Sequence, residues 1–170
     1  MAGTYIDICG PILGATVYSD NILVARDCEF ELPEIAPATA DIQASGTLSL
    51  PIIQLIDNME ATIKKIGVDA GLRKMIQFRS QQLEVRFVQQ IVKTNGMTTE
   101  VGCKAFIRGI PSKIPGLSGK VGEAVEAEAV YNLLKYQLYA DGVEQWCVDR
   151  TAGVIRIAGV DYAEKMNSLL

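Results

Sequence analysis

The 170-residue sequence predicts a mainly β protein, and two kinds of pattern predict it. Several segments alternate polar and apolar side chains with a period of two, which is the spacing of a half-buried strand. The dipeptide Asp141-Gly142 lies between two such segments. It favours a type I′ hairpin turn, whose two central residues both need a positive φ angle.

The expected strands follow one another along most of the chain. The first stops at Pro33, because proline cannot donate a ladder hydrogen bond. One of the clearest sets Leu83 and Val85 against Glu84 and Arg86. The expected strands are residues 28–32, 52–64, 83–88, 101–108, 123–140, 143–148 and 154–157.

Residues 123–140 carry two conflicting signals. Their alanine, glutamate and leucine content favours a helix. Their polarity alternates instead, and the apolar side changes near Leu133-Leu134, which a β-bulge would produce. We therefore predict a bulged strand.

Two helices and two irregular stretches complete the expected elements. Residues 69–77 open with Asp69 as an N-cap, and residues 161–169 open with Asp161. Residues 34–50 are small and polar, and residues 109–122 hold four glycines and two prolines. The first of these is long for a routine connection, and loops of that length in compact domains are usually functional or disordered.

At the N-terminus, residues 8–18 are apolar but contain Gly10, Pro11 and Gly14, which suits an extended arm. We expect one domain over residues 1–170, with an N-terminal arm over residues 1–15.

The composition excludes several classes of function. With 49% hydrophobic and 21% charged residues the chain can bury a core, and a net charge of −4 argues against a protein that coats nucleic acid. The chain has no histidine, which removes Ser-His-Asp and Cys-His pairs and most zinc sites. The four cysteines form no CxxC pair, and we expect them to be buried, reduced thiols. We see no signal peptide or transmembrane run, so we expect synthesis and folding in the cytoplasm.

Charge is distributed unevenly along the chain. Residues 1–60 carry nine acidic groups and one basic group, Arg26, whereas residues 61–170 carry eleven acidic and fifteen basic groups. This is either chance placement on solvated faces or the mark of two unlike surfaces. Two unlike surfaces would favour head-to-tail association between copies.

No candidate for catalysis survives comparison with a simpler interpretation. Residues 116–120 (GLSGK) suggest a phosphate loop, but the first glycine is misplaced and Val121 replaces the magnesium-binding Ser or Thr. Glu123, Glu126 and Glu128 could form a carboxylate site, with the last two about 7 Å apart on one strand face. With one tryptophan and 6% aromatic residues, no sugar platform is evident, and an exposed acidic stripe is the preferred reading.

The remaining candidates also have simple readings. The basic residues between 64 and 79 lack interleaved aromatics, so stacking on nucleic-acid bases is not expected. These residues form either a solvated face or a surface that binds the acidic N-terminal third. The cysteines have no imidazole to activate them, and Trp146 is expected to pack in the core or against a neighbouring strand. We assign no catalytic, cofactor-binding or metal-ligating residue.

The last forty residues resemble the major tail tube proteins of contractile-tailed bacteriophages and R-type pyocins. The resemblance rests on residues 131–142 (YNLLKYQLYADG), residues 149–161 (DRTAGVIRIAGVD) and residues 166–169 (MNSL). Residues 29–35 (EFELPEI) and 51–63 (PIIQLIDNMEATI) are similar to two further segments of that family. Ala158 replaces the asparagine of the usual Asn-Gly-Val-Asp.

The resemblance implies a fold and an assembly. The fold is a β-sandwich or partly closed barrel with one flanking helix and a short C-terminal helix, the phage tail tube fold. Such subunits form hexameric rings that stack head-to-tail into the inner tube of a contractile tail or pyocin-like particle. The tube serves DNA passage or membrane puncture and has no enzymatic activity or cofactor. Residues 34–50 would then be a long inter-subunit loop.

The resemblance also implies the partners and the location. The partners are the tail sheath, tape measure, baseplate and tail terminator proteins, with DNA only in passing and no small-molecule substrate. The location is the virion tail, assembled in the host cytoplasm. A net-acidic lumen would repel phosphate, so DNA would slide without sticking. The lumen-facing candidates are Glu126, Glu128, Glu84 and Glu60.

Two rival functions remain open at the level of sequence. A monomeric β-sandwich ligand-binding module would have a deep apolar pocket and covered sheet edges. A hydrolase would use Glu123, Glu126 or Glu128.

Overall fold

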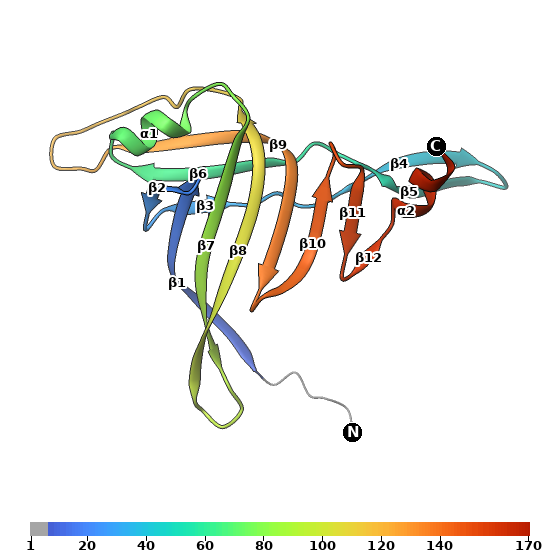
Figure 1. Ribbon diagram of the computed structural model, residues 1–170, viewed down its shortest axis with the longest axis horizontal. Helices are drawn as coiled ribbons and strands as arrows, with labels where there is room; N and C mark the ends of the chain where they lie inside the picture. The colour runs from blue at the N-terminus through green and yellow to red at the C-terminus, as the bar shows by residue number, and fades with distance from the viewer. Residues whose placement is uncertain (1–6) are drawn as a thin grey trace.

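The computed structural model describes residues 7–170 and shows one curled antiparallel sheet with three projections (Figure 1). Ten strands belong to the sheet, a separate hairpin (β4 and β5) extends to one side, and two short helices flank it. The elements are β1 (Ile8–Ser19), β2 (Ile22–Arg26), β3 (Glu29–Glu31), β4 (Pro37–Gln43), β5 (Thr47–Ile56), β6 (Glu60–Ile66), α1 (Ala70–Met75), β7 (Gln81–Val92), β8 (Thr98–Pro111), β9 (Glu126–Ala140), β10 (Val143–Asp149), β11 (Val154–Ile157), β12 (Val160–Asp161) and α2 (Glu164–Leu169).

The sheet is organised around β9. Its main path runs β12-β11-β10-β9-β8-β7-β1-β2, and β6 joins it through the first half of β9, with β3 paired to β6. The second half of β9 pairs with β8 on one side and β10 on the other. β9 therefore joins two parts of the curled sheet, the β3–β6 part and the part from β12 to β2.

A bulge in β9 makes this double role possible. The register between β8 and β9 shifts where Arg108 faces Lys135 and Gly109 faces Leu133, so Leu134 is the extra residue. A Cβ atom at Gly109 would lie 2.7 Å from the Asn132 carbonyl oxygen, so only glycine fits opposite the bulge. The predicted bulged strand is confirmed.

The predicted hairpin turn is also confirmed. Asp141 and Gly142 have φ angles of 50° and 75°, as a type I′ turn requires. The return strand is β10, as expected.

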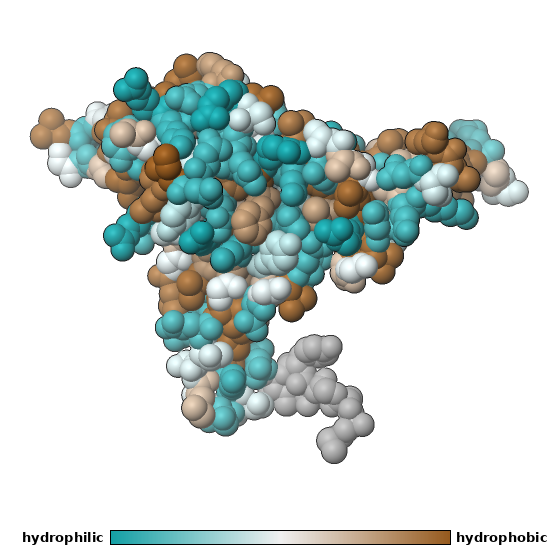
Figure 2. All heavy atoms as spheres, in the orientation of Figure 1, coloured by the Kyte–Doolittle hydropathy of each residue, from teal (hydrophilic) through white to brown (hydrophobic). Residues whose placement is uncertain are grey.

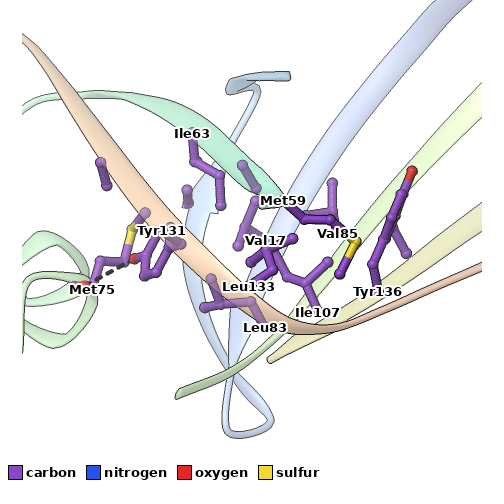
Figure 3. Close-up of a cluster of buried hydrophobic side chains, with 14 of the residues drawn as sticks. Val17, Met59, Ile63, Met75, Leu83, Val85, Ile107, Tyr131, Leu133 and Tyr136 are labelled. Carbon is purple, nitrogen blue, oxygen red and sulfur yellow. Dashed lines mark hydrogen bonds between the residues drawn. The ribbon is translucent and has the colours of Figure 1, made fainter. Parts of the chain in front are cut away.

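The curled sheet encloses the core (Figure 3). Side chains from β1, β6, β7, β8 and β9 point toward one another there, and Met75 of α1 closes one end. The fully buried large side chains include Val17, Ile63, Leu83, Ile107 and Tyr131. Alternation placed these residues on the inner face, because in a strand every second side chain points to the same side.

Closure of the barrel is partial. In the described sheet β2 is the last strand of the main path and β3 is reached through β6, so the two parts of the sheet meet at β1–β3 without a ladder. The hydrogen bond from the Asp27 N–H to the Ala15 carbonyl oxygen, at 2.9 Å, only extends the β1–β2 pairing by one position. Partial closure confirms the predicted mainly β, partly closed barrel.

Helix α1 has the predicted cap. The Asp69 side chain accepts a hydrogen bond from the Leu72 N–H at 3.0 Å, and Leu72 and Met75 are buried. The helix ends at Met75, two residues before the predicted boundary.

The prediction of an irregular segment over residues 34–50 is wrong. Residues 37–43 and 47–56 form the antiparallel hairpin of β4 and β5, in which Ile42 faces Leu48. The predicted single strand over 52–64 is wrong as well, because β5 ends at Ile56 and a separate strand, β6, begins at Glu60. Arg150 stabilises the connection between them by donating to the carbonyl oxygens of Ile56 and Asp57.

Both ends of the chain differ from expectation. Residues 8–19 form strand β1 against β7 rather than a free arm, and residues 1–6 of the predicted arm lie outside the described residues. The C-terminal helix starts at Glu164, because Asp161 belongs to β12 and its carboxylate accepts from the Ala163 N–H at 2.9 Å. Of the predicted irregular stretch 109–122, residues 109–111 complete β8 and the rest connects to β9.

The buried hydroxyl of Tyr131 provides a test of this core. It donates to the Met75 carbonyl oxygen at 2.9 Å and ties β9 to the end of α1. We expect Tyr131→Phe to lower the free energy of unfolding by about 1 kcal/mol, the usual net value of a buried hydrogen bond. Urea denaturation followed by the fluorescence of Trp146 measures it. The control is Tyr162→Phe on the surface, expected to change stability by less than about 0.5 kcal/mol; equal effects would contradict the assignment.

Candidate assembly surfaces

An acidic surface covers the outer face of β3, β6 and β9. Glu29, Glu31, Glu60, Glu126 and Glu128 are all exposed there. Lys64 lies among them, opposite Glu29 on β3 and Glu128 on β9, and its ammonium is 3.6 Å from the Glu29 carboxylate. Five carboxylates against one ammonium leave this surface, which we call the acidic wall, strongly negative.

Three of the four lumen candidates lie on the acidic wall. Glu126 and Glu128 lie two residues apart on the same face of β9, and Glu60 lies on β6 opposite Asn132 of β9. Glu84 does not join them. It lies on β7, where its carboxylate is largely covered and accepts a hydrogen bond from Arg86 at 2.6 Å.

A second polar surface covers the outer face of β7 to β11, and three ion pairs lie on it. Arg86 stacks 4.3 Å from the ring centroid of Tyr18 while it binds Glu84. Arg108 lies 3.4 Å from Asp149. We call this surface the paired-charge face.

Glu144 is the centre of the tightest cluster on the paired-charge face. Both of its oxygens accept from Arg156, at 2.5 and 3.0 Å, and Gln137 donates to it at 2.6 Å. The hydrogen bond from Arg156 holds the pKa of Glu144 at about 2. Partial burial and the nearby Glu144 carboxylate raise the pKa of the Tyr139 phenol. Sequence reasoning missed this cluster, because the residues come from three strands and a register irregularity in β10 sets their pairing.

The hairpin of β4 and β5 carries an exposed apolar face. Alternate cross-strand pairs point their side chains to opposite faces of the hairpin. One face carries the pairs Ala38–Ile52, Ala40–Leu50 and Ile42–Leu48, and the other carries the intervening pairs, which include Asp41–Ser49. Ile42 is 45% exposed and Leu48 is 51% exposed, although each has the other as its neighbour. Leu50 on the same face is 41% exposed, so the outer part of the face is open to solvent in the described chain.

A three-stranded ribbon and a long connection make the other projections (Figure 1). In the ribbon, β1 pairs with β7 from Ile8 onward, and β7 pairs with β8 as far as Val92 and Thr98. Beyond the β1–β2 pairing, residues 8–14 of β1 have β7 on one side and an open edge on the other. The connection between β8 and β9 exposes Ile114, Leu117 and Val121.

The accessible surface is large for the mass. A compact monomer of 18.4 kDa exposes about 8200 Å², whereas this chain exposes 10897 Å². The excess is of the order that obligate interfaces bury. Figure 2 shows apolar residues on the surface at both ends of the long axis.

The other candidates from the sequence occupy ordinary positions. Glu123 lies in the connection before β9, 3.4 Å from Lys120, and residues 116–120 belong to the same exposed connection. Trp146 packs edge-to-face on Tyr136 with ring centroids 5.8 Å apart, as predicted. Within residues 7–170, no cluster of three or more His, Cys, Asp or Glu side chains could hold a metal ion, and no helix is long and apolar enough to cross a membrane.

The cysteines are free thiols. Cys28, Cys103 and Cys147 are buried, and burial raises the pKa of each thiol, which keeps it protonated. Cys9 is exposed, so the prediction that all four are buried is wrong for that residue.

Comparison with protein families decides between the remaining readings. The family model of the phage tail tube protein FII matches residues 11–170. The chain is a phage tail tube protein. Its role as a structural component of the tail tube follows from that membership. Comparison with curated proteins found no match.

A solved structure shares the fold of this chain. A chain of the sheath–tube complex of an extracellular contractile injection system, PVC, in its extended state superposes with a TM-score of 0.55 and 11% identity. The match covers 77% of the tail tube protein and 91% of the PVC chain, and it shows a shared fold. A chain from the six-fold symmetrised baseplate of the anti-feeding prophage matches at a TM-score of 0.38 and 9% identity, over 84% of this chain and all of that chain. This second likeness is too low to support an argument.

The Glu144 cluster predicts a pH dependence of stability. A carboxyl whose pKa is lower in the folded state stabilises the fold above its unfolded pKa, and the contribution is lost as the pH falls toward the folded pKa. We expect Glu144→Gln to lower the free energy of unfolding at pH 7 by about 1 kcal/mol, since the pair is partly exposed.

The loss should shrink as the pH falls from about 4.5 to about 2, the unfolded and folded values for this carboxyl. Urea denaturation of dilute protein across this range measures the loss. Glu123→Gln, whose ion pair with Lys120 is exposed, is the control and should cost less at pH 7. A loss for Glu144→Gln that stayed constant down to pH 2 would refute the role of this cluster.

Proposed function

We propose that this tail tube protein assembles into hexameric rings that stack head-to-tail as the inner tube of a contractile phage tail or pyocin-like particle. The tube would conduct DNA or puncture a membrane passively, with no catalytic step. The family match over residues 11–170 is the observation that carries the proposal. The ring size and the contractile setting follow the sequence resemblance, and the fold shared with a chain of a contractile injection system supports the setting.

The shape of the monomer supports assembly with copies of itself. The edges of β2, β4 and β5 are unpaired within the described chain, and the β1 edge is open over residues 8–14. Open edges are aggregation hazards unless another chain pairs or covers them, and a ring of identical subunits can do so. The rival ligand-binding module requires covered edges, so the structure favours the tube.

We propose that the acidic wall lines the lumen. Its carboxylates face away from the core, and Glu60, Glu126 and Glu128 are exposed. A lumen of this charge repels the phosphates of passing DNA, so that DNA does not adhere. Glu84, on another wall and paired with Arg86, stays a separate prediction.

The remaining partners follow from the tube. The sheath would surround it, the tape measure would occupy it during assembly, and the baseplate and terminator would meet its two ends. The virion tail is the corresponding location.

Electron microscopy tests the assembly. We expect purified protein at high concentration to show six-fold rings or hollow filaments in negative stain. A species that sediments as a monomer at every concentration, with neither rings nor filaments, would refute the proposed function.

Charge reversal tests the lumen. Glu126→Lys with Glu128→Lys exchanges two exposed carboxylates, so the fold and the tube should form normally. Particles built from this variant should eject DNA more slowly, and the defect should diminish as salt rises. The control is Glu164→Lys with Glu100→Lys, two exposed carboxylates outside the acidic wall and outside the hairpin. Ejection at the normal rate by the first variant would place the acidic wall outside the lumen.

A further inference from the structure

The outer part of the apolar face of the hairpin is open to solvent in the described chain. The face consists of Ala38, Ala40 and Ile42 of β4 and their cross-strand partners Leu48, Leu50 and Ile52 of β5. Of these, Ile42, Leu48 and Leu50 are each more than 40% exposed. A monomer gains nothing from two strands that expose leucine and isoleucine on one face, so an occupant is expected.

The opposite end of the molecule offers a surface of the matching kind, which we call the α1 end (Figure 1). There Ile22 and Leu23 of β2, Val68 before α1 and Phe78 after it are exposed apolar residues. Arg73, in the last turn of α1, is exposed as well.

Charge complements this apolar match. The hairpin, residues 37–56, carries one acidic group, Asp41, and no basic one. Helix α1, residues 70–75, carries two basic groups, Arg73 and Lys74, and no acidic one. Contact between two hairpins or between two α1 ends would bring like charges together, whereas contact between unlike ends brings opposite charges together.

We propose that the apolar face of the hairpin of one copy packs on the α1 end of the next copy. The two surfaces lie at opposite ends of the long axis, so a single chain cannot join them (Figure 1). The contact is therefore heterologous, and it closes into a ring or continues as a filament. This inference deepens the proposed function and rests on it, since it names the contact through which tube subunits join.

Two variants of the hairpin test the face that makes the contact. Ile42→Asp with Leu48→Asp places two carboxylates on the apolar face, and burying them without partners is unfavourable. Gln43→Asp with Thr47→Asp is the matched control, because this neighbouring cross-strand pair adds the same charge to the opposite face. We expect the concentration needed for assembly to rise at least about tenfold for the first variant, equivalent to about 1.4 kcal/mol. The control should assemble like the wild type.

A mixing experiment tests the acceptor. Phe78→Asp alters the α1 end at a residue that is 63% exposed, so the subunit should still fold. At a protein concentration above the assembly threshold of the wild type and below that of the variants, each variant alone should sediment as a monomer. An equimolar mixture of Phe78→Asp with the Ile42→Asp, Leu48→Asp variant should form a dimer, because one intact hairpin then meets one intact α1 end. Circular dichroism checks that both variants are folded.

The possible failures have distinct meanings. If the wild type does not assemble, the proposed function fails. If the wild type forms tubes and the Ile42→Asp, Leu48→Asp variant does so at the same concentration, this inference alone is overturned. A mixture that stays monomeric also overturns the assignment of the α1 end.

Discussion

The double pairing of β9 is the constraint on which the rest of the structure depends. Its first half joins β6 and its second half joins β8 and β10, with the bulge at Leu134 between them. β9 therefore contributes residues to both polar surfaces: its first half belongs to the acidic wall, and its second half belongs to the paired-charge face. Tyr131 and Tyr136, on either side of the bulge, both point into the core, where burial raises the pKa of the Tyr136 phenol to about 12. The bulge thus keeps the inner face apolar along the whole strand.

Stability and assembly are assigned to different parts of the chain. The buried side chains belong to the curled sheet and α1, whereas the hairpin, the ribbon and the connection before β9 carry exposed apolar side chains. Substitutions in the projections can therefore change association with little cost to the folded subunit. This separation suits a protein that folds before it assembles.

The sequence predicted the strands whose alternation involves large apolar residues. Over residues 81–85 of β7, 103–111 of β8 and 127–133 of β9 every second residue is buried, so periodicity alone identifies the inner face there. The hairpin also alternates, with Ala38, Ala40 and Ile42 on one side, but its small residues hid the pattern. Ser45-Gly46, at φ angles of 56° and 122°, was the turn signal that could have revealed it. The cluster around Glu144 was not predictable, because its contacts depend on register between strands, which local pattern does not fix.

The hairpin has its own reason to dock by its face rather than by its edge. Pro51 stands in the interior of β5, opposite Thr39. Prolines in sheets are confined to edge strands, since they have no N–H to donate. A neighbouring strand added beyond β5 would turn it into a central strand, with one ladder bond missing at Pro51. Edge pairing there is thus disfavoured, while the side chains of Leu48 and Leu50 remain free to pack. The same proline that limits uncontrolled strand addition leaves the apolar face as the means by which the hairpin can bind a second copy.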